Sequence, residues 1–257
     1  MVDMLAGVIV AIDPSGGSTR HPVGKVAAAL RARESGGFVL ALENGFAFAD
    51  DDLAVTEVLA AVFDDPAIRF NDGGCDPLGR FLCGTMAYDE TPGAGSLYRL
   101  ATDHNVSTVF GDVTISNGLQ WSADGSRAFY NDTPTGRIDV FDVDSASGDL
   151  VNRRPFVTLD SDAGWPDGMA IDADDGVWIA LWGGSSVRRY ASDGTLSQVV
   201  ELPVSHVTAC TFGGTDRRTL YVTTSQQSLE PGAEPRAGSV FAYASPVAGA
   251  VPHRYAG

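Results

Sequence analysis

A short motif recurs along this chain at intervals that few folds can accommodate. In its clearest copy, residues 165–171 read Trp-Pro-Asp-Gly-Met-Ala-Ile, so that Asp167 stands ahead of an apolar strand. Asn71 and Asn117 hold the same place in two further copies, Thr208 in a weaker one and Ala28 in the weakest. From Asn71 to Thr208 these anchors are 46, 50 and 41 residues apart. Periods of about 40–50 residues with four short strands each are typical of β-propeller blades.

A second landmark accompanies the anchors. Six segments begin with Gly or Ser and alternate apolar with polar residues, as a half-buried strand requires. They are residues 7–13, 45–48, 95–100, 136–142, 186–190 and 238–243. Only five anchors precede them, so the partner of the first segment would fall ahead of residue 1. We therefore expect an all-β, six-bladed β-propeller that occupies residues 1–257 as a single domain and lacks the inner strand of its first blade.

Two local patterns add detail to this expectation. Asp174-Asp-Gly176 lies between two apolar runs and predicts a hairpin turn. Leu53–Val62 is the only segment with a helix-like pattern.

Composition limits the classes of partner and the compartment. The formal net charge of −16 disfavours nucleic acid and anionic membranes, because so acidic a surface repels phosphate groups. The three cysteines, Cys75, Cys83 and Cys210, lack metal-binding spacing and are expected to be buried thiols in a reducing compartment. The apolar run 4–12 lacks the basic flank of a signal peptide, and no run reaches the ~18 apolar residues of a membrane span. We expect a cytoplasmic protein, and the oligomeric state stays open.

Equivalent positions on the inner strands of a propeller meet around its axis, which would bring Asn71, Asn117 and Asp167 together. Amide and carboxylate oxygens suit a hard cation, which could polarise a carbonyl group. Taken singly, each of these residues could instead tie down a turn through its own backbone. Arg69 would point the same way as Asn71 by strand alternation. It could grip substrate oxygens or form a salt bridge at the rim.

Further candidates lie close to these anchors. Asp89 and Glu90 follow the strand at 81–86 and could pair with Arg69, bind hydroxyl groups, or stand as exposed loop carboxylates. Trp165, two residues before Asp167, is the tryptophan best placed to wall a pocket, and the other three are expected in the core or on blade faces. His206 precedes the Thr208 anchor and is expected to be an ordinary rim residue.

The motifs together resemble one family. They are Arg-Phe-Asn-Asp-Gly at 69–73, Gly-Thr-Met at 84–86, Ile-Ser-Asn-Gly-Leu at 115–119, Pro-Asp-Gly-Met at 166–169 and Phe-Gly-Gly at 212–214. In this order and spacing the chain is similar to the regucalcin (senescence marker protein), gluconolactonase and luciferin-regenerating enzyme family. The resemblance implies a six-bladed propeller with one divalent cation (calcium, magnesium, manganese or zinc) and, often, hydrolysis of sugar lactones.

The resemblance also implies roles for single residues. Asn117 and Asp167 match the metal-binding residues, and Asp167 also matches the catalytic general base. Arg69 and Asn71 match substrate-binding residues, and Asp89 falls where regucalcin has a substrate-contacting Glu. The family's remaining metal ligand is a Glu on the first blade's inner strand, the strand that the repeat count finds missing. Its loss is expected to weaken cation binding.

The leading hypothesis is therefore metal-dependent hydrolysis of a small sugar lactone, a small-molecule substrate. The cation would polarise the lactone carbonyl, and Asp167 would activate water. Two alternatives remain: a non-catalytic or truncated propeller that binds a cation or a protein partner, and a phosphotriesterase-like hydrolase.

Overall fold

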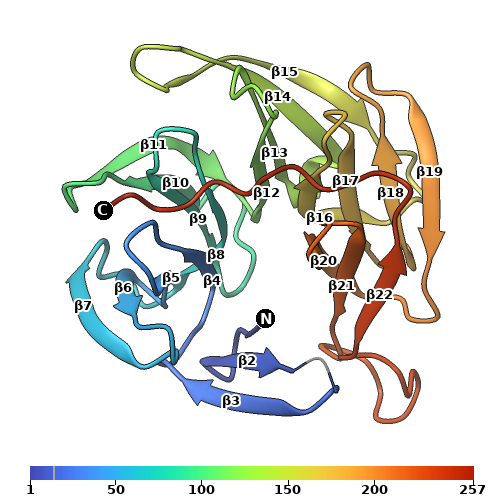
Figure 1. Cartoon of the computed structure of the whole chain (residues 1–257), viewed down its shortest axis with the longest axis horizontal. Coiled ribbons are helices and arrows are strands. Elements are labelled where there is room, and N and C mark those ends of the chain that lie inside the picture. Colours follow the sequence, from blue (N-terminus) through green and yellow to red (C-terminus); the bar gives the residue numbers. More distant parts are fainter. Residues whose placement is uncertain (14) are drawn as a thin grey trace. The chain divides into compact units, whose positions relative to one another are not determined.

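The computed structural model describes residues 1–13 and 15–257, and these are built almost entirely of β-strands (Figure 1). Six antiparallel sheets of three or four strands follow one another along the sequence. The single helical element in the described part is the 3₁₀ turn η1 (Thr133–Thr135). The predicted all-β, six-bladed β-propeller fold is thereby confirmed. The chain divides into two compact units, one of residues 1–116 with 253–257 and one of residues 117–252.

The first unit holds three sheets. Their strands, in chain order, are β1 (Val2–Asp3), β2 (Val8–Ile12) and β3 (Ser18–Pro22); β4 (Ala29–Ala32), β5 (Phe38–Ala41), β6 (Gly45–Ala49) and β7 (Val55–Ala61); and β8 (Ile68–Cys75), β9 (Phe81–Ala87), β10 (Gly95–Leu100) and β11 (Val106–Val113). In Figure 1 the sheet of β4 to β7 runs from blue to cyan. The C-terminal segment joins this unit, because Tyr255 bridges Arg33 in parallel and the Ala256 amide donates to the Gly79 carbonyl.

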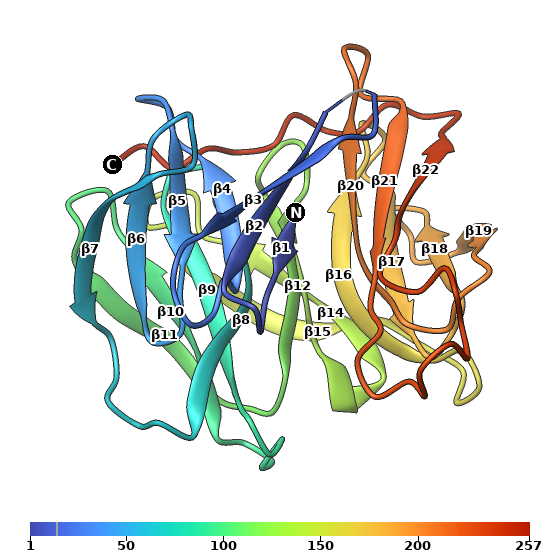
Figure 2. The same cartoon turned by 90° about the horizontal axis from the view of Figure 1, so that it is seen from below.

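The second unit also holds three sheets. Their strands are β12 (Ser116–Trp121), β13 (Arg127–Asp132), β14 (Arg137–Val143) and β15 (Leu150–Thr158); β16 (Trp165–Ile171), β17 (Val177–Trp182), β18 (Ser186–Tyr190) and β19 (Leu196–Glu201); and β20 (Val207–Gly213), β21 (Thr219–Thr224) and β22 (Val240–Ala244). Figure 2 shows β20, β21 and β22 side by side. Ser116, where β12 begins, is the last residue of the first unit before the division.

The two sequence landmarks fall on fixed positions in these sheets. The alternating segments are the third strands β6, β10, β14, β18 and β22 of five sheets, but the first alternating segment is β2, the second strand of its sheet. Within the described residues, the first sheet thus has one strand fewer ahead of this landmark, in agreement with the prediction.

The helix-like pattern at Leu53–Val62 is misleading, because this segment is the outer strand β7. Most residues of β7 are exposed, and only its Val55 and Leu59 are partly buried. Its pairing with the buried strand β6 outweighs the helical propensity of its Ala, Leu and Glu residues.

Each unit is stabilised by apolar clusters between its sheets. In the first unit, Phe46, Phe70 and Phe81 form one cluster, with the Phe46 and Phe70 ring centroids 4.8 Å apart. In the second unit, Trp178 and Leu220 belong to a cluster that β16 to β18 share with β20 to β22. All three cysteines are buried free thiols, as expected. No helix among the described residues has the length and hydropathy to cross a membrane.

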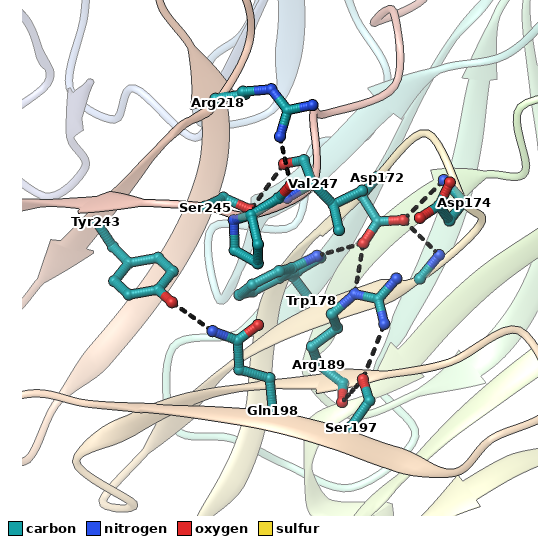
Figure 3. A network of polar contacts seen from close by, with 12 residues as sticks. Asp172, Asp174, Trp178, Arg189, Ser197, Gln198, Arg218, Tyr243, Ser245 and Val247 are labelled. Carbon is teal, nitrogen blue, oxygen red and sulfur yellow. Dashed lines mark hydrogen bonds and ion pairs between the residues drawn. The ribbon is translucent and has the colours of Figure 1, made fainter.

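Buried carboxylates fix the turns that follow the inner strands. Asp172 has no exposed surface and accepts hydrogen bonds from the amides of Asp174 and Gly176, Trp178 Nε1 and Arg189 Nε (Figure 3). This turn is the hairpin predicted at residues 174–176. Asp76, five residues after Asn71 just as Asp172 is five after Asp167, caps the β8–β9 turn and pairs with Arg80. These carboxylates are therefore structural.

Candidate functional site

Three of the sequence anchors lie at β-bulges. In β16, Pro166 pairs with Leu181 and Met169 pairs with Ile179. Two residues of β16, Asp167 and Gly168, therefore lie opposite the single residue Ala180 of β17. The ladder of β8 skips in the same way at residues 71 and 72, and that of β20 skips at Thr208. A bulge bends its strand and re-aims the side chain at that point. The recurrent anchor motif is thus a repeated irregularity of the inner strand.

In the second unit, the glycine after an anchor allows close approach of the next inner strand. Gly118 has φ +45°, and a Cβ there would lie 2.6 Å from Asn131 Nδ2 and 2.8 Å from the Asp167 carbonyl oxygen. A Cβ at Gly168 would lie 3.0 Å from both the Ala209 Cα and the Thr208 carbonyl oxygen. Larger residues would force the strands apart, so the Asn-Gly and Asp-Gly pairs serve strand packing as well as the site.

Asn117 is 7% exposed, and a hydrogen-bond relay determines how its amide is turned. Its Nδ2 donates to Thr133 Oγ1 over 2.8 Å, and the Thr133 hydroxyl donates to the Pro166 carbonyl over 2.8 Å. With the nitrogen directed at Thr133, the amide oxygen is the Asn117 atom that can ligate a cation.

Asp167 is half-buried, and its backbone is held from the neighbouring sheet. Asn131 is fully buried on β13 and donates from Nδ2 to the Asp167 carbonyl over 2.8 Å. Thr133 on η1 donates in the same way to the Pro166 carbonyl, so the consecutive carbonyls of residues 166 and 167 each accept a hydrogen bond from a side chain of another sheet or turn. The strand that carries the candidate base is therefore anchored on both sides of its Cα.

The donor set of this unit fits a hard divalent cation. Asn117 and Asp167 offer an amide oxygen and a carboxylate, which are oxygen ligands of the kind that calcium and magnesium prefer. Among residues 1–13 and 15–257, no three His, Cys, Asp or Glu side chains gather as a metal centre would need.

In the first unit the structure brings Arg69 and Asn71 into direct contact. Arg69 Nη1 donates to Asn71 Oδ1 over 2.7 Å and to the Phe70 carbonyl over 3.1 Å, while Asn71 Nδ2 donates to the Ser116 carbonyl over 2.9 Å. Both side chains are buried, and burial lowers the pKa of the Arg69 guanidinium. Strand alternation had predicted that these two residues share a direction, and their contact agrees with that expectation.

Asp89 stands apart from this pair in its contacts. Its Oδ1 accepts from the Thr91 amide and hydroxyl at 3.0 and 2.7 Å, an Asx turn in an exposed loop that lowers the pKa of Asp89. Of the two loop carboxylates, Glu90 is the one whose charge acts on Arg69 and favours its protonated form. Arg69 forms no ion pair within the described residues, and its Nε is buried without a hydrogen-bond partner there.

Trp165 and His206 differ in their surroundings. Trp165 is 51% exposed, whereas Trp121 and Trp178 are core residues. The His206 ring stacks on Trp182, with centroids 4.0 Å apart and an interplanar angle of 10°.

Sequence reasoning missed three residues that organise these contacts: Thr133, Asn131 and Tyr88. Tyr88 lies beneath the Arg69 guanidinium, 5.6 Å from it, and donates its hydroxyl to Glu43, which also pairs with Lys25. Thr133 and Asn131 act on residues 33 and 36 positions away. A single sequence holds no signal for such contacts, apart from the general tendency of buried polar residues to be bonded.

Comparison with known proteins identifies the family. A family model for the SMP-30/gluconolactonase/LRE-like region matches residues 1–226. Regucalcin of Xenopus laevis is 39% identical over 234 residues, which cover 87% of this chain and 77% of that protein.

Solved structures agree with this match. A calcium-binding protein, regucalcin, from Agrobacterium tumefaciens has a TM-score of 0.91 at 28% identity and covers 98% of this chain and 87% of its own. A luciferin-regenerating enzyme has a TM-score of 0.85 at 30% identity, with 100% of this chain and 89% of its own covered. This chain belongs to the SMP-30/gluconolactonase/LRE-like family.

Proposed function

We propose that this protein hydrolyses a small sugar lactone with the help of one divalent cation. Membership of a family that includes gluconolactonases supports the reaction class. The relationship to regucalcin, named a calcium-binding protein in one solved structure, supports the cation. The observation that carries the proposal furthest is the relay that turns the nitrogen of Asn117 toward Thr133 and so selects its oxygen as a ligand beside Asp167.

When bound, the cation supplies Lewis-acid polarisation of the lactone carbonyl. Asn117 and Asp167 would hold it, and the Asp167 carboxylate would accept a proton from the water as the water oxygen bonds to the carbonyl carbon. The ring C–O bond would then break, and the departing ring oxygen would take the proton back from Asp167 to give the open hydroxy acid.

We assign substrate binding to Arg69, Asn71 and Asp89. The guanidinium of Arg69 is planar and presents several donors, which suits the hydroxyl and carbonyl oxygens of a sugar lactone. Asn71 adds a side-chain amide whose position the Arg69 contact determines. Asp89 is exposed, and its Oδ2 is free of the turn with Thr91, which uses Oδ1, so we assign to Oδ2 the acceptance of hydrogen bonds from substrate hydroxyl groups.

The test is the substitution Asp167→Asn, which removes the negative charge and keeps the shape of the side chain. We expect gluconolactone hydrolysis to fall to background while the circular dichroism spectrum stays that of the parent. The matched control is Asp162→Asn, an exposed carboxylate in the loop ahead of β16, which should keep full activity. Turnover by Asp167→Asn equal to that of the parent would exclude Asp167 as the base.

Calorimetric titration of calcium, magnesium, manganese and zinc into the chelator-treated protein tests the cation separately. We expect micromolar or weaker binding of at least one ion, and its loss in Asp167→Asn. A folded protein that binds none of the four ions and hydrolyses no lactone would favour a non-catalytic propeller. A panel of phosphotriesters on the same samples checks the alternative substrate class.

A further inference from the structure

The bulge in β16 disturbs the hydrogen-bond ladder at the residues that bear on the site. Register is kept at Pro166 opposite Leu181 and is regained only at Met169 opposite Ile179. Backbone carbonyls at such a break need partners from elsewhere, because unpaired buried carbonyls are costly. The carbonyls of Pro166 and Asp167 receive them from Thr133 and Asn131.

The Thr133 hydroxyl connects both cation-ligand candidates. A hydroxyl group has one proton to donate, and Thr133 gives it to the Pro166 carbonyl. Toward Asn117 it must therefore accept, which requires the amide nitrogen rather than the amide oxygen to face it. One side chain on η1 thus sets the rotation of the Asn117 amide and holds the strand at the residue before Asp167.

Asn131 differs from an ordinary core residue in that only half of its amide is bonded. Its Nδ2 donates to the Asp167 carbonyl, while its Oδ1 is buried and has no hydrogen-bond partner within the described residues. An apolar side chain would avoid this unpaired oxygen at the same place. The presence of an amide here is explained by its nitrogen, which holds the Asp167 carbonyl at the point where the Gly118 backbone approaches it.

From these contacts we propose that Thr133 and Asn131 are positioning residues for the site, with Thr133 orienting the Asn117 amide oxygen and both holding the β16 backbone around Asp167. The part of this inference that concerns cation binding rests on the proposed function, whereas the orientation of Asn117 by Thr133 does not depend on it. Neither residue is assigned a contact with substrate; each acts through Asn117 or Asp167.

The experiment compares four variants of the full chain, three in η1 and Asn131→Leu in β13. Thr133→Val replaces the hydroxyl by a methyl group of similar size, and Thr133→Ser restores the hydroxyl. Thr135→Val is the matched control, since Thr135 lies in the same turn and its hydroxyl donates only to the Asp132 carbonyl. The first readout is the NMR signal of the Asn117 side-chain NH₂ group in metal-free protein, assigned by its loss in Asn117→Asp. The second is the calorimetric affinity for calcium.

We expect Thr133→Val alone to shift the Asn117 NH₂ signals and speed their exchange with solvent. Calcium affinity should fall roughly 10- to 100-fold, the usual effect of losing a partner that orients a ligand. Thr133→Ser should restore both readouts, and Thr135→Val should match the parent. Asn131→Leu, which keeps the volume but removes the donor, should weaken calcium binding as well.

The outcomes separate this inference from the proposed function. If Thr133→Val leaves the Asn117 signals unchanged, the positioning role is wrong, whatever the cation does. If the parent binds none of the four cations but Thr133→Val still shifts those signals, the proposed cation is wrong and the orientation of Asn117 by Thr133 stands. Equal losses in Thr133→Val and Thr135→Val would indicate a general effect of the turn and overturn the inference.

Discussion

Removal of the Asp172 carboxylate should show how strongly the second unit depends on one buried charge. Asp172 is fully buried and its carboxylate takes four hydrogen bonds, two from backbone amides and two from side chains (Figure 3). Its ion-pair partner Arg189 has only 13% of its side chain exposed. In Asp172→Ala, Arg189 keeps its bond to Ser197 but loses its counter-charge, and Trp178 Nε1 loses its acceptor.

The size of the effect follows from this burial. Leaving one member of a buried ion pair uncompensated costs about 3–5 kcal/mol. At about 2–4 °C per kcal/mol for a chain of this length, the melting temperature should fall by roughly 6–20 °C. The control is Asp142→Ala, which removes an ion pair of similar length, 2.7 Å against 2.6 Å, whose side chains are 47% and 41% exposed. Water screens that pair, so its loss should hardly move the midpoint.

The assay is equilibrium unfolding of the parent and both variants, followed by circular dichroism and by tryptophan fluorescence. Coincident transitions are needed before a free energy is assigned, because two compact units can unfold separately. Equal and small losses in Asp172→Ala and Asp142→Ala would refute the reasoning, since burial would then not set the value of the pair. A large loss confined to Asp172→Ala would support it.

Three further predictions concern the strands, the substrate and the thiols. Gly136→Ala, at φ +63° in open space, should cost roughly 1–2 kcal/mol, whereas Gly118→Ala should cost distinctly more in urea titrations because its Cβ meets Asn131 and Asp167. Arg69→Lys keeps the charge but loses the planar donors, so steady-state kinetics should show KM rising more than kcat falls. Burial raises the pKa of the Cys75 and Cys210 thiols to about 12; in the unfolded chain these thiols have the ordinary pKa of about 8.5. Stability should therefore be intact below that pH and fall as the pH approaches 12, and thiol reagents at pH 8 should label the cysteines only after unfolding.

The sequence was sufficient for the fold because the fold is repetitive. The anchors Asn71, Asn117 and Asp167 lie on β8, β12 and β16, and every alternating segment is a strand. The repeat period predicts these strands directly, because every blade needs the same pattern of buried and exposed residues. It failed at Leu53–Val62, where a largely exposed outer strand carries residues that also suit a helix.

The site was less accessible to sequence reasoning. The pairing of Arg69 with Asn71 followed from alternation along one strand, which is a local property. The Asx turn of Asp89 and the relay through Thr133 depend on which donors surround each oxygen. The Asx turn is a local contact of a kind that Asp favours. The relay through Thr133 arises from packing between strands far apart in sequence, so neither the spacing nor the residue type predicts it.

The glycines that follow two of the anchors indicate which positions of the site can be substituted without moving the strands. At Gly118 and Gly168 the next inner strand lies so close that a Cβ on either glycine would come within 3.0 Å of its main chain. The residues just ahead, Asn117 and Asp167, therefore project from places whose separation does not depend on their own identity. Mutation could exchange these two side chains, and with them the ligand or the chemistry, while the frame persists. Loss of either glycine would instead alter the frame and every function built on it.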